Sequence, residues 1–424
     1  MNLLIETIRG ISYALVSPTL SLMLLIIAVI FYFKNKKIAL MQKLMLGRSL
    51  KSPLEMTLLQ ILMGILGGVI GSLILSFLGI SFENGFFVNI ILTVSIVSIM
   101  YKNRFMKLPY IVFILGIIGI LINRNAKYLG ANFNFSINLT AIAALVSVLA
   151  IVEGILIILD GDKGYLPVFA QKNGLLVGGF GFRRFWILPL CLLVFLGKND
   201  NSFISEIGNI PSYLPFLRDY GDKILMGVLS IGTIASYGVV SYEGVTFTLN
   251  KKRKLLQSGS LNIIYGLIIL LLAYFLRGSY FLTVVLILLI PFIYLIKSKV
   301  EFNLEERREP VYFSKEDSIC ILDVLPNSIA YKKGIRGGDR IIKIDGNKPK
   351  SEKDIFKALK ENFYGLEMEV KNIKGEITKY TITSNDRRNA LGIVLVPKGE
   401  SFEREIDEFL KKIQKASKDK EIKK

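Results

Sequence analysis

The chain of 424 residues contains no histidine, and this absence removes several kinds of catalytic site. A Ser-His-Asp triad, a Cys-His pair and a zinc-binding HExxH helix all need an imidazole. The two cysteines, Cys191 and Cys320, lie far apart and lack the spacing of a metal or disulfide framework. We therefore expect no catalytic residue, no metal site and no cofactor, and we interpret both cysteines as buried apolar side chains.

Acidic residues are also scarce in the first 300 residues, where long apolar runs dominate. The chain has 53 Lys and Arg against 34 Asp and Glu, and residues 1–300 carry +15 of the net charge of +19. Apolar runs long enough to cross a hydrocarbon core of about 30 Å recur through residues 11–297 and then stop. The basic excess lies in loops between these runs, which indicates membrane topology and not nucleic-acid binding. We therefore predict a multi-pass protein of the cell membrane that contacts lipid and binds no nucleic acid.

The apolar runs predict a polytopic α-helical membrane bundle of about nine spans, or eight if one short run is re-entrant. Loops that follow odd-numbered spans hold 17 basic residues, whereas the opposite set holds seven. The positive-inside rule therefore predicts an N-terminus outside and a C-terminal module in the cytoplasm. The predicted spans are residues 11–33, 57–80, 86–100, 108–122, 139–159, 185–197, 224–242, 261–276 and 280–297.

Three features of the membrane part depart from plain apolar spans. Residues 38–59 mix apolar and basic positions, so they form either an interfacial helix or a connector with retention charges. The glycine-rich residues 160–184 match neither a phosphate loop nor a dinucleotide motif, and we interpret them as a cytoplasmic turn. Glu153 lies inside a predicted span, where an ionisable residue is a functional candidate. Its position about two helical turns from the inner end favours a structural role.

From Ser318 onward the pattern changes to short strands and one amphipathic helix. The stretches "SICILDVL" and "DRIIKIDG" predict strands, the second closed by an Asp-Gly turn. Residues 351–363 predict a helix with one apolar face, residues 366–382 a hairpin, and residues 391–397 a last strand. We therefore divide the chain into a multi-pass transmembrane domain (1–300), a small cytoplasmic α+β domain (301–399) and a charged helical or disordered tail (400–424).

The stretch "PNSIAYKKGIRGGDRIIKIDGNKPKSEKDIFKAL" resembles the PDZ domains of bacteria, and the resemblance covers about 90 residues. It implies a module that binds an extended peptide by strand addition beside its longer helix, with the peptide carboxylate held by a φ-Gly-φ loop. That loop is Leu391-Gly392-Ile393 if the strand order is permuted, whereas otherwise residues 310–313 supply the strand entrance without a glycine. A third interpretation is that residues 391–393 only pack and bind no free terminus. The peptide-binding residues implied by the first placement are Leu391, Gly392, Ile393, Ile355, Ala358 and Leu359.

The layout of the whole chain resembles the MinJ family of membrane proteins of cell-division topology. The resemblance lies in "ISYALVSPTLSLMLLIIAVIFYFKNKK" with its basic connector, in "RRFWILPL" and in the single C-terminal PDZ module. It implies a non-enzymatic scaffold at septa and poles that links a curvature-sensing coiled-coil polar protein to the MinD-type ATPase of the division inhibitor. Two other functions stay open, namely an adaptor that delivers clients to a separate protease or secretion machine, and a transporter with a regulatory PDZ module.

Overall fold

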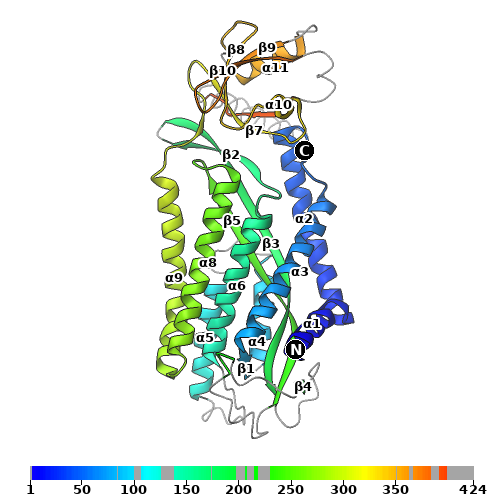
Figure 1. The fold of residues 1–424 in the computed structure, drawn as a ribbon, viewed down its shortest axis with the longest axis vertical. Helices are drawn as coiled ribbons and strands as arrows, with labels where there is room; N and C mark the ends of the chain where they lie inside the picture. Colours follow the sequence, from blue (N-terminus) through cyan, green and yellow to red (C-terminus); the bar gives the residue numbers. More distant parts are fainter. Residues whose placement is uncertain are drawn as a thin grey trace, which may run out of the picture.

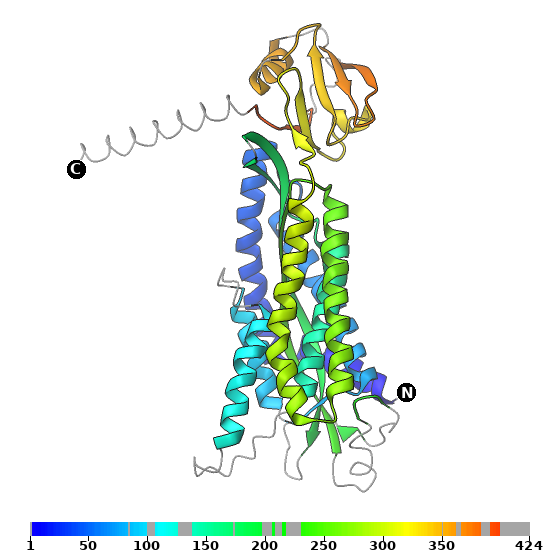
Figure 2. The same ribbon diagram turned by 90° about the vertical axis from the view of Figure 1, so that its left-hand side faces the viewer.

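The protein has a long helical part and a small domain seated on one end of it (Figure 1). The N-terminus lies toward the opposite end of the helical part (Figures 1 and 2). The predicted tail, residues 400–424, lies outside the described residues. The computed structural model describes residues 2–83, 85–99, 107–125, 138–172, 174–196, 206–207, 214–217, 230–349, 351–361, 366–382 and 391–398.

Among these residues, five helices are long and apolar enough to cross a membrane, and two shorter apolar helices accompany them. All seven coincide with spans predicted from the sequence. The long helices are α2 (Pro18–Leu46), α3 (Pro53–Leu78), α6 (Leu139–Asp160), α8 (Lys251–Leu276) and α9 (Tyr280–Glu306), and the shorter ones are α4 (Gly85–Val97) and α5 (Leu108–Asn125).

The predicted first span, residues 11–33, is wrong at its start. A separate helix, α1 (Asn2–Val16), ends before Ser17, and α2 begins at Pro18. Proline lacks the N–H that would continue the preceding helix, and its fixed φ suits the first turn of a new one. At its other end α2 runs on to Leu46, where Gly47 takes a φ of 76°. Residues 38–59 are therefore the end of one long helix, a turn and the start of α3, and not one interfacial helix.

The predicted sixth and seventh helical spans, residues 185–197 and 224–242, are wrong in type, because their described residues, 185–196 and 230–242, belong to two long strands. The strands β3 (Leu175–Leu196) and β5 (Ser230–Thr246) pair antiparallel along a ribbon that runs from Phe180↔Thr246 to Leu196↔Ser230. Three glycines and Pro189 disfavour a helix in β3, whereas β5 is rich in residues that favour strands. An apolar run alone does not distinguish a buried strand from a helix.

Short strands pair with parts of the outer edges of this ribbon, and elsewhere along these edges helices supply hydrogen bonds that a neighbouring strand would otherwise give. The N–H of Cys191 in β3 donates to Ser72 Oγ of α3 at 2.9 Å. On the other edge, the N–H of Val239 in β5 donates to Ser95 Oγ of α4 at 3.0 Å. Strands at membrane depth need such partners, because lipid offers none to an unpaired backbone group.

A row of glycines lets α3 lie directly against the backbone of β3. A Cβ at Gly64 would overlap the carbonyl oxygen of Ile187, and one at Gly68 would overlap that of Pro189. Residues four apart share a helix face, so Gly64 and Gly68 form one smooth strip. Small residues in this spacing permit close packing between elements in a membrane.

The glycine-rich residues 160–184 form a hairpin that continues the ribbon, where the sequence predicted only a turn. The strand β2 (Leu166–Lys172) pairs antiparallel with the first part of β3. At its base, Asp160 Oδ2 accepts bonds from Arg184 Nη2 at 2.6 Å and from Trp186 Nε1 at 2.9 Å. All three side chains are buried, so this ion pair fastens the end of α6 to the ribbon.

The C-terminal domain is an antiparallel five-stranded sheet in the order β10-β9-β8-β7-β11. The strands and the one helix predicted here from the sequence are confirmed over the described residues. The predicted domain boundary at residue 300 stays a prediction, and α9 continues beyond it to Glu306. The elements are β7 (Ile319–Val324), α10 (Ile329–Lys332), β8 (Arg340–Ile344), α11 (Glu352–Glu361), β9 (Leu366–Lys371), β10 (Ile377–Ile382) and β11 (Ile393–Leu395).

Candidate peptide-binding site

The φ-Gly-φ segment predicted as the carboxylate loop leads directly into β11, the edge strand of the small sheet. Its central residue, Gly392, has a φ of 71°, a conformation that side chains with a Cβ rarely adopt. A Cβ at this position would also overlap the Cβ of Ser328, which caps α10. Both the backbone conformation and the close approach therefore require glycine here.

Two successive amide groups of this loop point away from α10. The carbonyl of Leu391 accepts from the N–H of Ala330 at 3.3 Å, and that of Gly392 accepts from the N–H of Leu325 at 2.7 Å. In a trans peptide the N–H points opposite to the carbonyl. The N–H groups of Gly392 and Ile393 therefore face the other side of the loop, where adjacent donors can hold an anion such as a carboxylate.

The hydrogen bonds of β11 also show which backbone groups face its open edge. Gly392 and Val396 bond toward β7, the latter by donating its N–H to Cys320 O at 2.9 Å. In an antiparallel ladder successive residues alternate between facing the neighbour and facing away. Ile393 and Leu395 therefore direct their N–H and C=O groups outward, where an extended peptide can add as a further strand.

The predicted peptide groove lies between this open edge and α11. Ile355 is fully buried, and Ala358, Leu391 and Ile393 pack against the same apolar cluster. The side chain of Leu359, also predicted for the site, lies outside the described residues. Of the predicted site residues, the structure thus brings together Leu391, Gly392, Ile393, Ile355 and Ala358.

The alternative entrance at residues 310–313 lies elsewhere. Its last two residues form β6 (Tyr312–Phe313), which pairs with β3 of the ribbon at Val177 and Gly178. This strand joins the C-terminal domain to the membrane part and takes no place in the five-stranded sheet. The geometry therefore favours the placement of the loop at residues 391–393.

The opposite face of the small sheet packs against the membrane part. Cys320, Leu322, Val394 and Val396 share one apolar cluster with residues of the ribbon and its connections, including Phe180. All six residues of β7 are consequently buried. Burial raises the pKa of the Cys320 thiol to about 11.

Asp323 is the polar centre of this interface, and sequence reasoning missed its role. Its carboxylate accepts a hydrogen bond from the hydroxyl of Tyr165 and two from Lys251 Nζ, at 2.8 and 2.9 Å. Burial, followed by the nearby carboxylate of Asp323, raises the pKa of Tyr165. The signal in the sequence is an aspartate inside an otherwise apolar strand, because a buried carboxylate needs a partner from elsewhere.

A β-bulge turns Asp323 toward the membrane part. The register of β7 and β11 passes from Asp323↔Val394 to Ile321↔Leu395, so Leu322 is one extra residue on β7. A bulge of this kind changes the direction of the side chains next to it. It places both Leu322 and Asp323 on the face that meets the ribbon.

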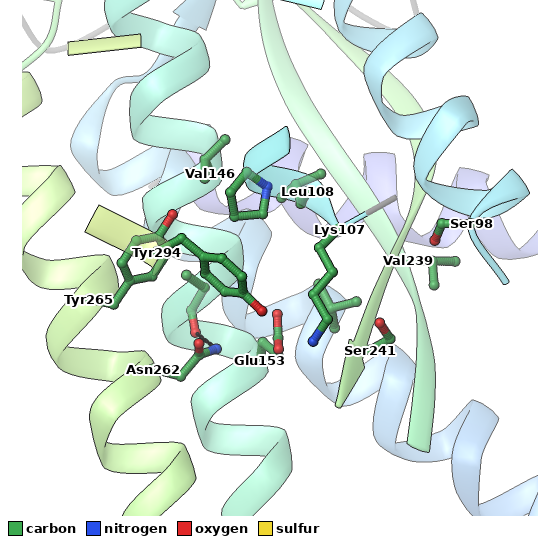
Figure 3. Close-up of a pocket in the computed structure, with 13 residues that line it drawn as sticks. Ser98, Lys107, Leu108, Val146, Glu153, Val239, Ser241, Asn262, Tyr265 and Tyr294 are labelled. Atoms are coloured by element: carbon green, nitrogen blue, oxygen red, sulfur yellow. Dashed lines mark hydrogen bonds between the residues drawn. The ribbon is translucent and has the colours of Figure 1, made fainter. Parts of the chain in front are cut away.

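A second polar feature lies inside the bundle, around Glu153. The carboxylate of Glu153 and the ammonium of Lys107 point toward one another across a small cavity that Asn262, Ser241 and Tyr294 also line (Figure 3). The cavity volume is about 20 Å³, which is room for a single water molecule. A charge that faces an opposite charge at membrane depth supports the structural interpretation of Glu153.

Comparison with known proteins gives two matches. Residues 321–365 match the PDZ domain family. Over 317 residues the chain is 25% identical to "Cell division topological determinant MinJ" of Bacillus subtilis (strain 168), an alignment that covers 72% of this chain and 74% of that protein. No solved structure gives a significant match. The chain is thus a distant homologue of MinJ, with several apolar helices and a C-terminal PDZ domain.

Proposed function

We propose that this protein is a non-enzymatic membrane adaptor for division-site placement, which recruits partners through its PDZ domain. The observation that carries the proposal is the Gly392 loop, whose two outward amides lead into an open sheet edge beside α11. This combination suits the capture of an extended peptide with a free carboxylate. The distant similarity to MinJ supports division topology as the process served.

The proposal places the PDZ domain in the cytoplasm and the N-terminus outside. The alternation of basic loops supports this orientation, and so does the position of the PDZ domain and the N-terminus toward opposite ends of the helical part (Figure 1). Lipid holds the bundle, and enrichment at septa and poles follows from capture of partners located there. A short groove gives modest affinity, so confinement to the membrane and multivalency strengthen the recruitment.

The partners proposed are a curvature-sensing coiled-coil protein of the poles and a MinD-type ATPase, by resemblance to the MinJ family. Gly392→Val should abolish capture of such a partner, because the larger residue distorts the loop and meets Ser328. The measurement is co-purification of the cross-linked full chain with each partner from membranes of the host.

Gly375→Val is the matched control, because Gly375 also has a positive φ, of 96°, but lies in the hairpin between β9 and β10. Ala358→Trp, which fills the groove and leaves the loop unchanged, should act like Gly392→Val. Capture that survives both groove variants refutes the proposed site. If the groove variants instead lose co-purification of a protease or secretion component, and not of the division proteins, the result favours the client-delivery function.

A further inference from the structure

The end of α2 lies next to the open edge of the peptide groove. α2 and β11 are in contact, and Arg48 Nη2, just beyond the end of α2, donates to the carbonyl of Pro326 at 2.9 Å. Pro326 follows Leu325, whose N–H holds the Gly392 loop. Figure 2 shows the end of α2 beneath β11, with α11 above it. A strand added to β11 therefore passes between α11 and the end of α2.

Side chains alternate along β11 between the side that faces α11 and the side that faces the membrane part. Ile393 and Leu395 belong to the PDZ core beside α11, whereas Val394 and Val396 face the membrane part. A peptide strand added to this sheet has the same alternation. If its terminal residue enters the apolar wall near Ile355, then the residues one and three positions earlier face the end of α2.

The exposed side chains at this end are basic and apolar. Lys43 and Arg48 are exposed, and Leu44 between them is 77% exposed. The buried face of the same helix end is formed by Ala39 and Gln42, the latter bonded to the carbonyl of Tyr165. A surface with two exposed cations beside an apolar side chain complements a strand that carries carboxylates at alternate positions.

We propose that Lys43, Leu44 and Arg48 form a second wall of the groove, which selects C-terminal peptides with acidic residues one and three positions before the terminal residue. The membrane part thereby sets the specificity of the PDZ domain docked on it. The ligand is the C-terminal segment of a cytoplasmic partner. This inference rests on the proposed function, since it requires that the groove binds a peptide.

Fluorescence polarisation on the full chain in phosphatidylcholine nanodiscs tests this wall. The probes are two labelled nine-residue peptides of equal composition, each ending in valine with a free carboxylate. One carries Glu one and three positions before the end, and the other carries Glu two and four positions before it. The first should bind about tenfold tighter, a preference that the charge reversal Lys43→Glu with Arg48→Glu removes.

Lys36→Glu with Lys37→Glu is the matched control, because these exposed lysines lie on the same helix about two turns from Lys43. This control should keep the tenfold preference. Lys43→Glu alone repeats the test with the Arg48 contact to Pro326 intact. Equal affinity for the two peptides, or a preference that survives charge reversal, refutes the second wall but does not contradict the peptide groove. Failure of both peptides to bind the unchanged chain contradicts the groove and the wall together.

Discussion

At the scale of single residues, Asp323 decides how the PDZ domain sits on the membrane part. It is 7% exposed, and its carboxylate accepts hydrogen bonds from two side chains of the membrane part, the Tyr165 hydroxyl and the Lys251 ammonium. The Nζ of Lys251 also lies 3.9 Å from the ring centre of Tyr165, so the three groups form one unit. A buried carboxylate of this kind ties the orientation of two domains to a single hydrogen-bonded cluster.

Asp323→Asn should loosen this docking and expose Cys320, which lies on the same interface. The loss of a charge-assisted bond costs about 1–3 kcal/mol, which raises the open population about 5- to 150-fold. The measurement is the rate of maleimide labelling of Cys320 at pH 8, with labelled peptides assigned by mass spectrometry to separate Cys320 from Cys191.

Asp317→Asn is the control, because Asp317 pairs with Lys348 at 2.9 Å on the exposed surface of the same domain. An Asp323→Asn chain that labels no faster than this control contradicts the role of Asp323 in docking.

At the scale of elements, the ribbon of β3 and β5 is the main feature that the sequence did not predict. Its apolar runs have the length and composition of spans, and periodicity does not separate a fully buried strand from a helix. The pairing of Leu188 with Gly238, or of Cys191 with Ala235, depends on segments far apart in the chain. The signals that were present are Pro189 near the centre of one run and the β-branched residues of the other.

More of the structure of the small domain than of the ribbon could be predicted from the sequence, because the turns of this domain carry specific residues. The Asp345-Gly346 turn, which the sequence indicated, has φ values of 46° and 77°, and Gly334 follows the end of α10 with a φ of 90°. The residues proposed for the groove follow from this order of elements. The contribution proposed for α2 does not, since nothing local in residues 40–48 indicates which surface of the domain they meet.

Gly68→Leu should destabilise the bundle, because the added side chain meets the backbone of β3 at Pro189 and neither element can move away. Overpacking of this kind costs about 1–3 kcal/mol and displaces the helix. The expected result is a lower Tm in detergent, followed by the loss of monodisperse protein on size exclusion.

Gly278→Leu provides the comparison, because a Cβ at Gly278 meets no atom within 4 Å. If both variants unfold at the same temperature, the close packing of α3 on β3 does not contribute to the stability of the bundle.

At the scale of the whole molecule, the uneven distribution of charge and the position of the docked domain predict how the chain is oriented across the membrane. Residues 1–300 carry +15 of the net charge of +19, with the basic residues in loops that alternate along the chain, and the PDZ domain caps the end of the bundle opposite the N-terminus. A reporter enzyme fused after Lys424 should therefore be active only as a cytoplasmic fusion. Activity of an exported reporter at the same position would reverse the orientation and remove the PDZ domain from its proposed partners.

The central claim, placement of the division site by a membrane-held PDZ domain, is tested most directly by imaging a fluorescent fusion in living host cells. The full chain is compared with one that ends after Phe313, which keeps β6 and the whole bundle. We predict enrichment of the full chain at septa and poles, with minicells or filaments when the PDZ domain is missing. An even distribution around the membrane, together with normal division of the truncated strain, would contradict the account.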